Sequence, residues 1–147
     1  MAFEVTSNYL DHIGIPACTG MTKGKRELPV SGSCHCGAVQ IAVPGAPEWV
    51  GSCNCSFCTK IGSLMAYYPD DGAVRVSGDT VAYIWGDRMI SLHHCPTCGC
   101  FTDWRSTGES HGKVGVNARL LDGFAVEEGQ ALFDGLPLEV RYLDNKG

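Results

Sequence analysis

Long hydrophobic runs and basic runs are both missing from this sequence. No segment approaches the roughly 18 consecutive apolar residues that a membrane-spanning helix needs, so we expect no membrane partner. The first ten residues lack the basic and apolar regions of a signal peptide, which favours a cytoplasmic location. The formal net charge is −5, and an acidic chain without a basic run is a poor match for nucleic acid. We therefore expect no nucleic-acid partner.

Segments of helical period are also missing. Short apolar runs alternate with turn signals, and the 19 glycines and 7 prolines are typical of a fold with many short strands. Residues 121–134 are predicted to form a loop with at most a helical turn. The expected fold class is all-β, with at most one or two short helices. Alternating patterns and turn residues predict strands at residues 38–43, 64–68, 73–76, 81–85, 89–94, 113–120 and 136–143.

The length of 147 residues suits one folded domain. We expect residues 1–30 to form an N-terminal arm and residues 31–147 to form the all-β domain. The arm is predicted to contain a short helix at residues 8–13. We expect it to cover a sheet edge or to contact a second copy of the chain, which would make a homodimer.

Cysteine, by contrast, is abundant. Seven of the nine cysteines lie in three short runs: Cys34-His35-Cys36-Gly37, Cys53-Asn54-Cys55-Ser56-Phe57-Cys58 and Cys95-Pro96-Thr97-Cys98-Gly99. In a reducing compartment such runs bind metal rather than form disulfides, and thiolates select zinc or iron–sulfur centres. Seven thiolates suit one closed four-sulfur site and one three-sulfur site with an open position, as in structural and catalytic zinc. We therefore predict two zinc ions.

The residues that follow the cysteines indicate which of them share a metal. A glycine follows Cys36 and Cys98, where a positive φ lets the chain turn and aim amide groups at sulfur. Cys58 is followed by Thr59 instead. By spacing alone, an alternative grouping places Cys55 and Cys58 with Cys95 and Cys98. The glycines favour a closed site of Cys34, Cys36, Cys95 and Cys98, and a three-ligand site of Cys53, Cys55 and Cys58.

A short repeat supports two related turns. Gly32-Ser33-Cys34-His35-Cys36 and Gly51-Ser52-Cys53-Asn54-Cys55 share the pattern G-S-C-x-C. The repeat predicts that the same ligand-bearing turn is used twice.

The remaining candidate groups have plain structural readings. Cys100 either completes the three-ligand site or is a half-buried strand residue, which we favour, and Cys18 is expected to be a small hydrophobe. Supporting roles are expected for His35, His93 and His94. We expect core or cleft positions for Trp49, Trp85 and Trp104.

The cysteine runs resemble those of the glutathione-dependent formaldehyde-activating enzymes, a family that includes relatives of centromere protein V. The motifs are G-S-C-H-C-G-A-V, C-N-C-S-F-C, C-P-T-C-G and the stretch V-N-A-R-L-L-D-G at residues 116–123. The resemblance implies an all-β fold of the Rab-accessory-factor type, with antiparallel sheets stacked around a structural zinc. It implies that this zinc is held by Cys34, Cys36, Cys95 and Cys98, and that a catalytic zinc is held by Cys53, Cys55 and Cys58.

The activity that the resemblance implies is the reversible condensation of formaldehyde with glutathione, a carbon–sulfur lyase reaction. The partner would then be a small anionic thiol. Two other functions compete with this one: a non-catalytic zinc-binding interaction module, and a thiol redox protein with Cys100 or Cys18 as its reactive thiol. Surface solvation is the default reading for each candidate cation that could bind the thiol, namely Lys60, Arg88, Arg105, Lys113 and Arg119.

Overall fold

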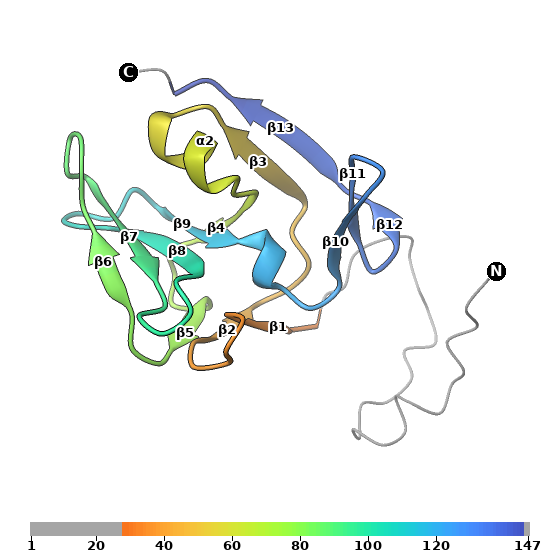
Figure 1. Cartoon of the computed structure of the whole chain (residues 1–147), viewed down its shortest axis with the longest axis horizontal. Coiled ribbons are helices and arrows are strands. Elements are labelled where there is room, and N and C mark those ends of the chain that lie inside the picture. The colour runs from red at the N-terminus through yellow and green to blue at the C-terminus, as the bar shows by residue number, and fades with distance from the viewer. Residues whose placement is uncertain (1–27, 146–147) are drawn as a thin grey trace.

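The computed structural model describes residues 28–145, which form three β-sheets, one short α-helix and one 3₁₀ turn (Figure 1). The prediction of an all-β fold with at most two short helices is confirmed for these residues. The helix predicted at residues 8–13 and most of the expected arm lie outside the described residues. Within the described part of the chain, no helix has the length and apolar character needed to cross a membrane.

The largest sheet has seven strands in the order β13-β3-β4-β9-β8-β7-β6. Its neighbours are antiparallel except at one edge, where β13 runs parallel to β3. Four consecutive residues of β9 are buried, as expected of a central strand that is covered on both faces. The strands are β3 (Trp49–Cys53), β4 (Met65–Pro69), β6 (Val81–Tyr83), β7 (Ile90–His94), β8 (Phe101–Ser106), β9 (Lys113–Asn117) and β13 (Glu139–Leu143).

Two three-stranded sheets complete the strand inventory of residues 28–145. The first has the order β1-β2-β5 and the second the order β10-β11-β12. The helix α2 (Ser56–Ile61) follows β3, and the 3₁₀ turn η1 (Ala118–Leu120) follows β9. The strands are β1 (Val30–Ser33), β2 (Gln40–Val43), β5 (Arg75–Ser77), β10 (Phe124–Glu127), β11 (Gln130–Phe133) and β12 (Leu136–Pro137).

The prediction of a loop at residues 121–134 is wrong, because this segment contains a β-hairpin. Phe124 of β10 lies opposite Phe133 of β11. The two residues between these strands, Glu128 and Gly129, both have positive φ, at 48° and 80°. Tight turns with two positive φ values have the twist that hairpins require, so this short turn joins two strands.

The hydrophobic core lies between the first small sheet and the seven-stranded sheet. It combines inward-facing residues of β1 and β2, such as Val30 and Ile41, with Val50, Val114 and Val116 of the large sheet. All five are at most 2% exposed. Full burial of such side chains contributes roughly 1.5–3 kcal/mol each to folding.

A glycine lets the small sheet approach the large one closely. A Cβ atom on Gly32 of β1 would lie 2.1 Å from the carbonyl oxygen of Leu120 in η1. A hydrogen bond beside this contact stabilises it: the amide of Asp122 donates to the carbonyl of Ser31 at 2.8 Å. Only glycine permits this approach, which fixes the end of β1 and thereby the start of the first cysteine run.

Candidate functional site

The structure collects the seven cysteines of the three runs into two clusters. Within each cluster the sulfur atoms all lie within 4.8 Å of one another. The grouping is the one that the flanking glycines predicted, and Cys55 and Cys58 do not join Cys95 and Cys98. The four-cysteine cluster contains Cys34, Cys36, Cys95 and Cys98, and the three-cysteine cluster contains Cys53, Cys55 and Cys58.

The four-cysteine cluster joins the small sheet to the large one. Cys34 directly follows β1, and Cys95 directly follows β7. The Cys36 sulfur lies 3.6 Å from the Cys34 sulfur and 3.7 Å from the Cys95 sulfur. Sulfurs about 2.3 Å from a tetrahedral zinc are about 3.8 Å apart, so this spacing fits the ion. Cys34 and Cys95 are buried.

Glycine turns direct amide groups at these sulfurs. Gly37 and Gly99 have φ values of 81° and 77°, as the sequence predicted. Beyond the first turn, the Val39 amide donates to the Cys34 sulfur at 3.3 Å. Beyond the second, the Cys100 amide, followed in effect by the Cys36 amide of the first run, lowers the pKa of Cys98 to about 5. Such donors stabilise negative sulfur, the form that binds metal.

The same cluster resists having all its thiols ionised without a cation. The Ala38 amide lowers the pKa of Cys36, but burial and the three neighbouring thiols outweigh it and raise that pKa to about 11. One thiolate therefore makes the next harder to form. A divalent zinc would relieve this repulsion, so the donor set fits the ion.

Cys100 lies beside the four-cysteine cluster, so it is not the missing ligand of the three-cysteine cluster. Its side chain packs against the buried group formed by Cys34, Val39 and Cys95. Its carbonyl also accepts the Cys95 amide at 2.9 Å. Cys18 lies outside the described residues.

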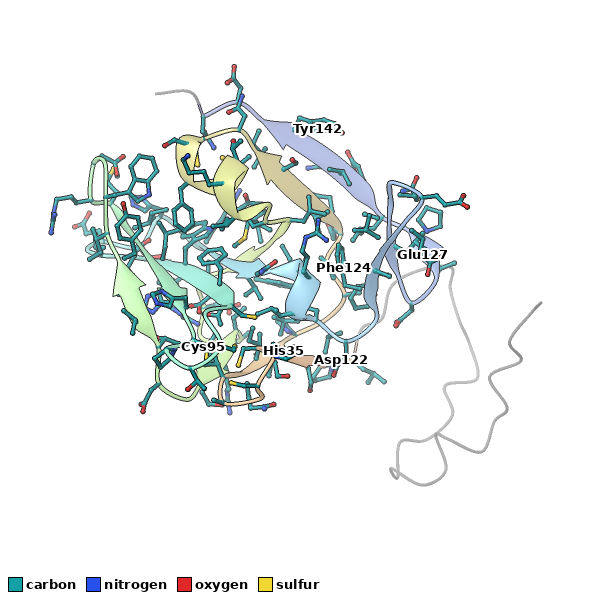
Figure 2. The ribbon with its side chains drawn as sticks, in the orientation of Figure 1. His35, Cys95, Asp122, Phe124, Glu127 and Tyr142 are labelled. Atoms are coloured by element: carbon teal, nitrogen blue, oxygen red, sulfur yellow. The ribbon has the colours of Figure 1, made fainter. Side chains whose placement is uncertain are left out.

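The described contacts of His93, Trp49 and Trp104 agree with the supporting and packing roles that the sequence predicted for them. The ring nitrogens of His93 bond with Thr80 and Ser91 at 3.0 and 2.9 Å, which leaves neither nitrogen for a metal. The exposed His35 lies in the four-cysteine turn (Figure 2). Packed aromatic contacts join Tyr67 to Trp49 and to Trp104, with ring centroids 5.1 and 6.2 Å apart.

The three-cysteine cluster is built around the start of helix α2. Cys53 ends β3, and Cys55 caps the helix, its sulfur accepting the Cys58 amide at 3.3 Å. The Cys55 amide in turn donates to the Cys53 sulfur at 3.4 Å. The helix is fixed to the sheet by Phe57, whose ring stacks on Tyr83 with centroids 5.8 Å apart. The helix thus supplies the amides that glycine turns supply in the other cluster.

Exposure and charge distinguish this cluster from the first. All three cysteines are partly exposed. Burial raises the pKa of Cys58 to about 12. Burial also acts to raise the pKa of Cys55, but the Cys58 amide and the neighbouring thiols outweigh it, so that this pKa is lowered. Within residues 28–145 no fourth cysteine, histidine or carboxylate joins the three sulfurs at the same spacing.

Residues after β13 hold the turn between Cys53 and Cys55. The side-chain amide of Asn145 donates to the Cys53 sulfur at 3.3 Å. Its backbone amide donates to Asn54 at 2.9 Å, and Asn54 donates to Asp144 at 2.9 Å. Sequence analysis missed these residues because nothing in their spacing connects them to the cysteines.

Ser63 is a second contributor that sequence analysis missed. It is 6% exposed, and its hydroxyl has no hydrogen-bond partner among the described residues. It nevertheless lies close enough to Cys58 to act against the burial that raises the pKa of that thiol. A buried hydroxyl beside a sulfur suits a thiolate that accepts a hydrogen bond from it, and the thiolate is the form that a bound zinc would stabilise.

Two hollows flank the three-cysteine cluster. The first, of about 440 Å³, includes Cys53, Cys58, Arg119, Tyr142 and Asp144 in its lining. The second, of about 450 Å³, is lined by Asn54, Cys55, Ser56, Thr59, Lys60, Trp85 and Asn145. Asn54 and Thr59 belong to both linings, so the two hollows adjoin at the three-cysteine cluster. Figure 2 labels Tyr142, which lines the first hollow, on β13 near the top of the view, and Cys95 of the four-cysteine cluster in its lower part.

Of the five candidate cations, the structure brings two to these hollows. Arg119 lines the first and Lys60 the second. Arg105 instead pairs with Asp103 at 3.2 Å. Arg88 and Lys113 line neither hollow.

Comparison with known proteins agrees with these features. A model of the family described as glutathione-dependent formaldehyde-activating enzyme matches residues 29–132. The crystal structure of a Rhodobacter sphaeroides protein, a structural-genomics target, is similar with 28% identity and a TM-score of 0.58. The match covers 76% of this chain and 99% of that one. No match is found among curated proteins.

Proposed function

Because the chain belongs to the family of glutathione-dependent formaldehyde-activating enzymes, we propose that it is a carbon–sulfur lyase that joins formaldehyde, or a similar aldehyde, to glutathione or a similar thiol. Cys53, Cys55 and Cys58 hold a catalytic zinc in this proposal, and the four-cysteine cluster holds a structural zinc. The observation that carries it is the three-cysteine cluster, which has no fourth ligand among residues 28–145 and lies between two hollows.

The reaction forms one carbon–sulfur bond. The thiol sulfur attacks the carbonyl carbon, the carbonyl double bond becomes a carbon–oxygen single bond, and the proton that the thiol loses ends on the oxygen. A zinc ion at the three cysteines supplies positive charge, which lowers the pKa of a bound thiol or polarises a carbonyl oxygen.

The chain's own residues hold the three sulfurs in place for this chemistry. The amides of Cys55 and Cys58 and the side chain of Asn145 donate to sulfur, which fixes the direction of each ligand. The hollows on either side leave the cluster open to a substrate. None of the eight described cysteines is paired in a disulfide, which suits the reducing cytoplasm that we propose as the location.

The test compares the purified protein with a Cys55→Ser variant. Exchange between formaldehyde and S-hydroxymethylglutathione is followed by NMR exchange spectroscopy, and zinc is counted per chain. We expect two zinc ions and exchange above the spontaneous rate in the wild type. Cys55→Ser is expected to retain its fold and one zinc but to return to the spontaneous rate. A wild type that never exceeds that rate would contradict the lyase proposal.

A matched control separates the competing functions. Cys100→Ser removes a thiol beside the other cluster, and we expect it to keep wild-type activity. Two zinc ions without any acceleration would favour a non-catalytic zinc-binding module. Sulfoxide reduction by the wild type that is lost in Cys100→Ser, with both zinc ions retained, would favour a thiol redox protein.

A further inference from the structure

The two hollows beside the three-cysteine cluster differ in charge. The first contains a cation and an anion, Arg119 and Asp144. The second contains the cation Lys60, and no acidic residue is among its described lining residues. The first hollow therefore offers partners for a group that carries both signs, and the second offers a partner for a simple anion.

Arg119 is held at the first hollow by the turn that precedes it. The buried Asn117 caps η1, its side-chain oxygen accepting the Arg119 amide at 3.2 Å, while its side-chain nitrogen donates to the Phe101 carbonyl at 2.9 Å. The Arg119 Nε donates to the Gly62 carbonyl at 3.2 Å, at the end of helix α2. The structure records no other hydrogen bond for this guanidinium among residues 28–145, so its Nη groups remain available for a carboxylate.

Asp144 and Lys60 lie at different hollows, Asp144 at the first and Lys60 at the second. Asp144 accepts a hydrogen bond from Asn54 at 2.9 Å, which holds its carboxylate at the first hollow. Lys60 lies in the last turn of helix α2, and no ion pair is recorded for it within the described segment. Trp85 forms an apolar wall of the second hollow and is 37% exposed.

We propose that the thiol substrate lies across the three-cysteine cluster in one direction, with a zwitterionic amino-acid group in the first hollow and a lone carboxylate in the second. The inference rests on the proposed function and specifies how the thiol is recognised. Glutathione has this form, since its γ-glutamyl end carries an ammonium and a carboxylate on one carbon, and its glycine end carries a carboxylate alone. Its γ-glutamyl end pairs with Arg119 and Asp144, and its glycine end pairs with Lys60.

The reverse direction juxtaposes like charges. It places the substrate ammonium beside Lys60 and leaves a lone carboxylate to share the first hollow with Asp144. Because Arg119, Asp144 and Lys60 are exposed, each pair has a modest effect, and removing one charge is expected to raise KM about three- to fivefold. The direction in which the thiol binds is therefore detected by comparing the KM changes for several thiols, because no single variant is expected to lose most of its affinity for one of them.

The test uses three thiols: glutathione, γ-glutamylcysteine, which lacks the glycine, and cysteinylglycine, which lacks the γ-glutamyl group. KM for each is measured with the zinc-loaded protein at saturating formaldehyde, and binding of each thiol is measured by calorimetry without formaldehyde. The variants are Lys60→Gln, Arg119→Gln and Asp144→Asn, with Lys113→Gln as a matched control on an exposed part of β9 outside both hollows. Zinc content is measured for every variant.

We expect Lys60→Gln to weaken the binding of glutathione and cysteinylglycine three- to fivefold and to leave the binding of γ-glutamylcysteine unchanged. Arg119→Gln and Asp144→Asn should weaken the binding of glutathione and γ-glutamylcysteine and leave the binding of cysteinylglycine unchanged. Since Arg119 also bonds to Gly62, Arg119→Lys is included, and its retained charge should restore most of the affinity.

The opposite pattern, or equal effects on all three thiols, would overturn the inference. A wild type that accelerates the reaction while lacking the pattern would overturn only the inference. A wild type that accelerates nothing would instead overturn the proposed function, and calorimetry would then decide the direction of thiol binding by itself.

Discussion

The two cysteine clusters begin from the same turn and end as different kinds of site. In both, a G-S-C-x-C segment comes at the end of a strand, β1 in one case and β3 in the other. After Cys36 the chain returns along β2 and meets cysteines from the β7–β8 connection. After Cys55 it enters helix α2, whose Cys58 completes the cluster. Because the β7–β8 connection completes the four-cysteine cluster, that cluster links two sheets. Because helix α2 completes the three-cysteine cluster, that cluster is a local structure with an open side.

The difference shows how one motif can serve stability or chemistry. Cys34 and Cys95 are buried and tie together segments that are far apart in sequence. The three-cysteine cluster draws its ligands from a six-residue run and is partly exposed. A metal that cross-links distant segments contributes directly to folding, whereas a metal on a local, open turn is expected to affect stability little.

The largest expected difference between the clusters comes from removing one ligand of each. Cys95→Ser should lower the free energy of unfolding by more than about 4 kcal/mol, since it removes a buried ligand and the link between sheets. Cys55→Ser should lower it by less than about 1 kcal/mol. Urea denaturation followed by circular dichroism measures both, and equal losses would mean that the clusters do not differ in this way.

The two glycines of the repeated turn provide a smaller contrast. A Cβ on Gly32 would meet backbone, with the Leu120 oxygen 2.1 Å away, whereas a Cβ on Gly51 would meet the side chains of Leu143 and Tyr67 at 2.8 Å. Side chains can move more easily than backbone, so Gly32→Ala should cost about 3 kcal/mol and Gly51→Ala about 1 kcal/mol. Thermal denaturation of the two variants measures both losses of stability. A larger loss for Gly51→Ala than for Gly32→Ala would contradict the prediction.

Acid should release the zinc ions in two steps. Metal binding requires thiolates, and Cys58, whose pKa burial raises to about 12, is protonated in the metal-free protein at neutral pH. Zinc must displace this proton, so its affinity for the three-cysteine cluster should fall about tenfold per pH unit for each proton displaced as the pH is lowered. In the four-cysteine cluster Cys36, with a pKa of about 11, must lose its proton as well, but the amides that lower the pKa of Cys98 to about 5 leave that thiol already ionised at neutral pH, and four sulfurs rather than three hold the ion.

We therefore expect the three-cysteine cluster to lose its zinc at a higher pH than the four-cysteine cluster. A pH titration with a chromogenic zinc chelator follows the release. Cys55→Ser should lack the first step and keep the second. Release of both ions in one step from the wild type would contradict the expected order.

The smallest effect concerns the hydroxyl of Ser63. Ser63→Ala removes a potential donor to Cys58 and should weaken zinc binding at the three-cysteine cluster about tenfold. The free energy of unfolding should not fall, because the variant also removes a buried hydroxyl without a partner. Competition with a chelator measures the affinity, with Ser33→Ala beside the other cluster as the control. Equal affinities for Ser63→Ala and the wild type would exclude this role.

The grouping of the cysteines followed from the sequence because it depends on local backbone conformation. Gly37 and Gly99 adopt the positive φ that their positions indicated. The contribution of helix α2 to the three-cysteine cluster did not follow, because a six-residue helix is too short to give a periodic signal. Asn145 and Ser63 were missed for another reason, since they reach the cysteines only through tertiary structure.

Strand prediction located several strands but not all of their ends. Residues 113–120 were predicted as one strand, but the strand β9 ends at Asn117 and the last three residues form η1. Residues 136–143 were also predicted as one strand, but they form the two strands β12 and β13. Asp134 and Gly135, with φ values of 50° and 78°, form the tight turn that connects β11 to β12, at the end of the segment that was predicted to be a loop. Likewise, β8 follows directly on the third cysteine run, whose metal-binding pattern obscured the strand that begins at Phe101.

The parallel pairing of β13 with β3 bears on the order in which the protein is completed during synthesis. The hydrogen bond between Asn54 and Asp144 spans 90 positions of sequence, whereas the contact between Cys36 and Cys95 spans 59. On the ribosome, where N-terminal segments emerge first, the four-cysteine cluster can close once Cys98 has emerged. The three-cysteine cluster, although its ligands are neighbours in sequence, must wait for β13 and Asn145. The more local of the two clusters is therefore expected to form last, after the rest of the protein has folded around the four-cysteine cluster.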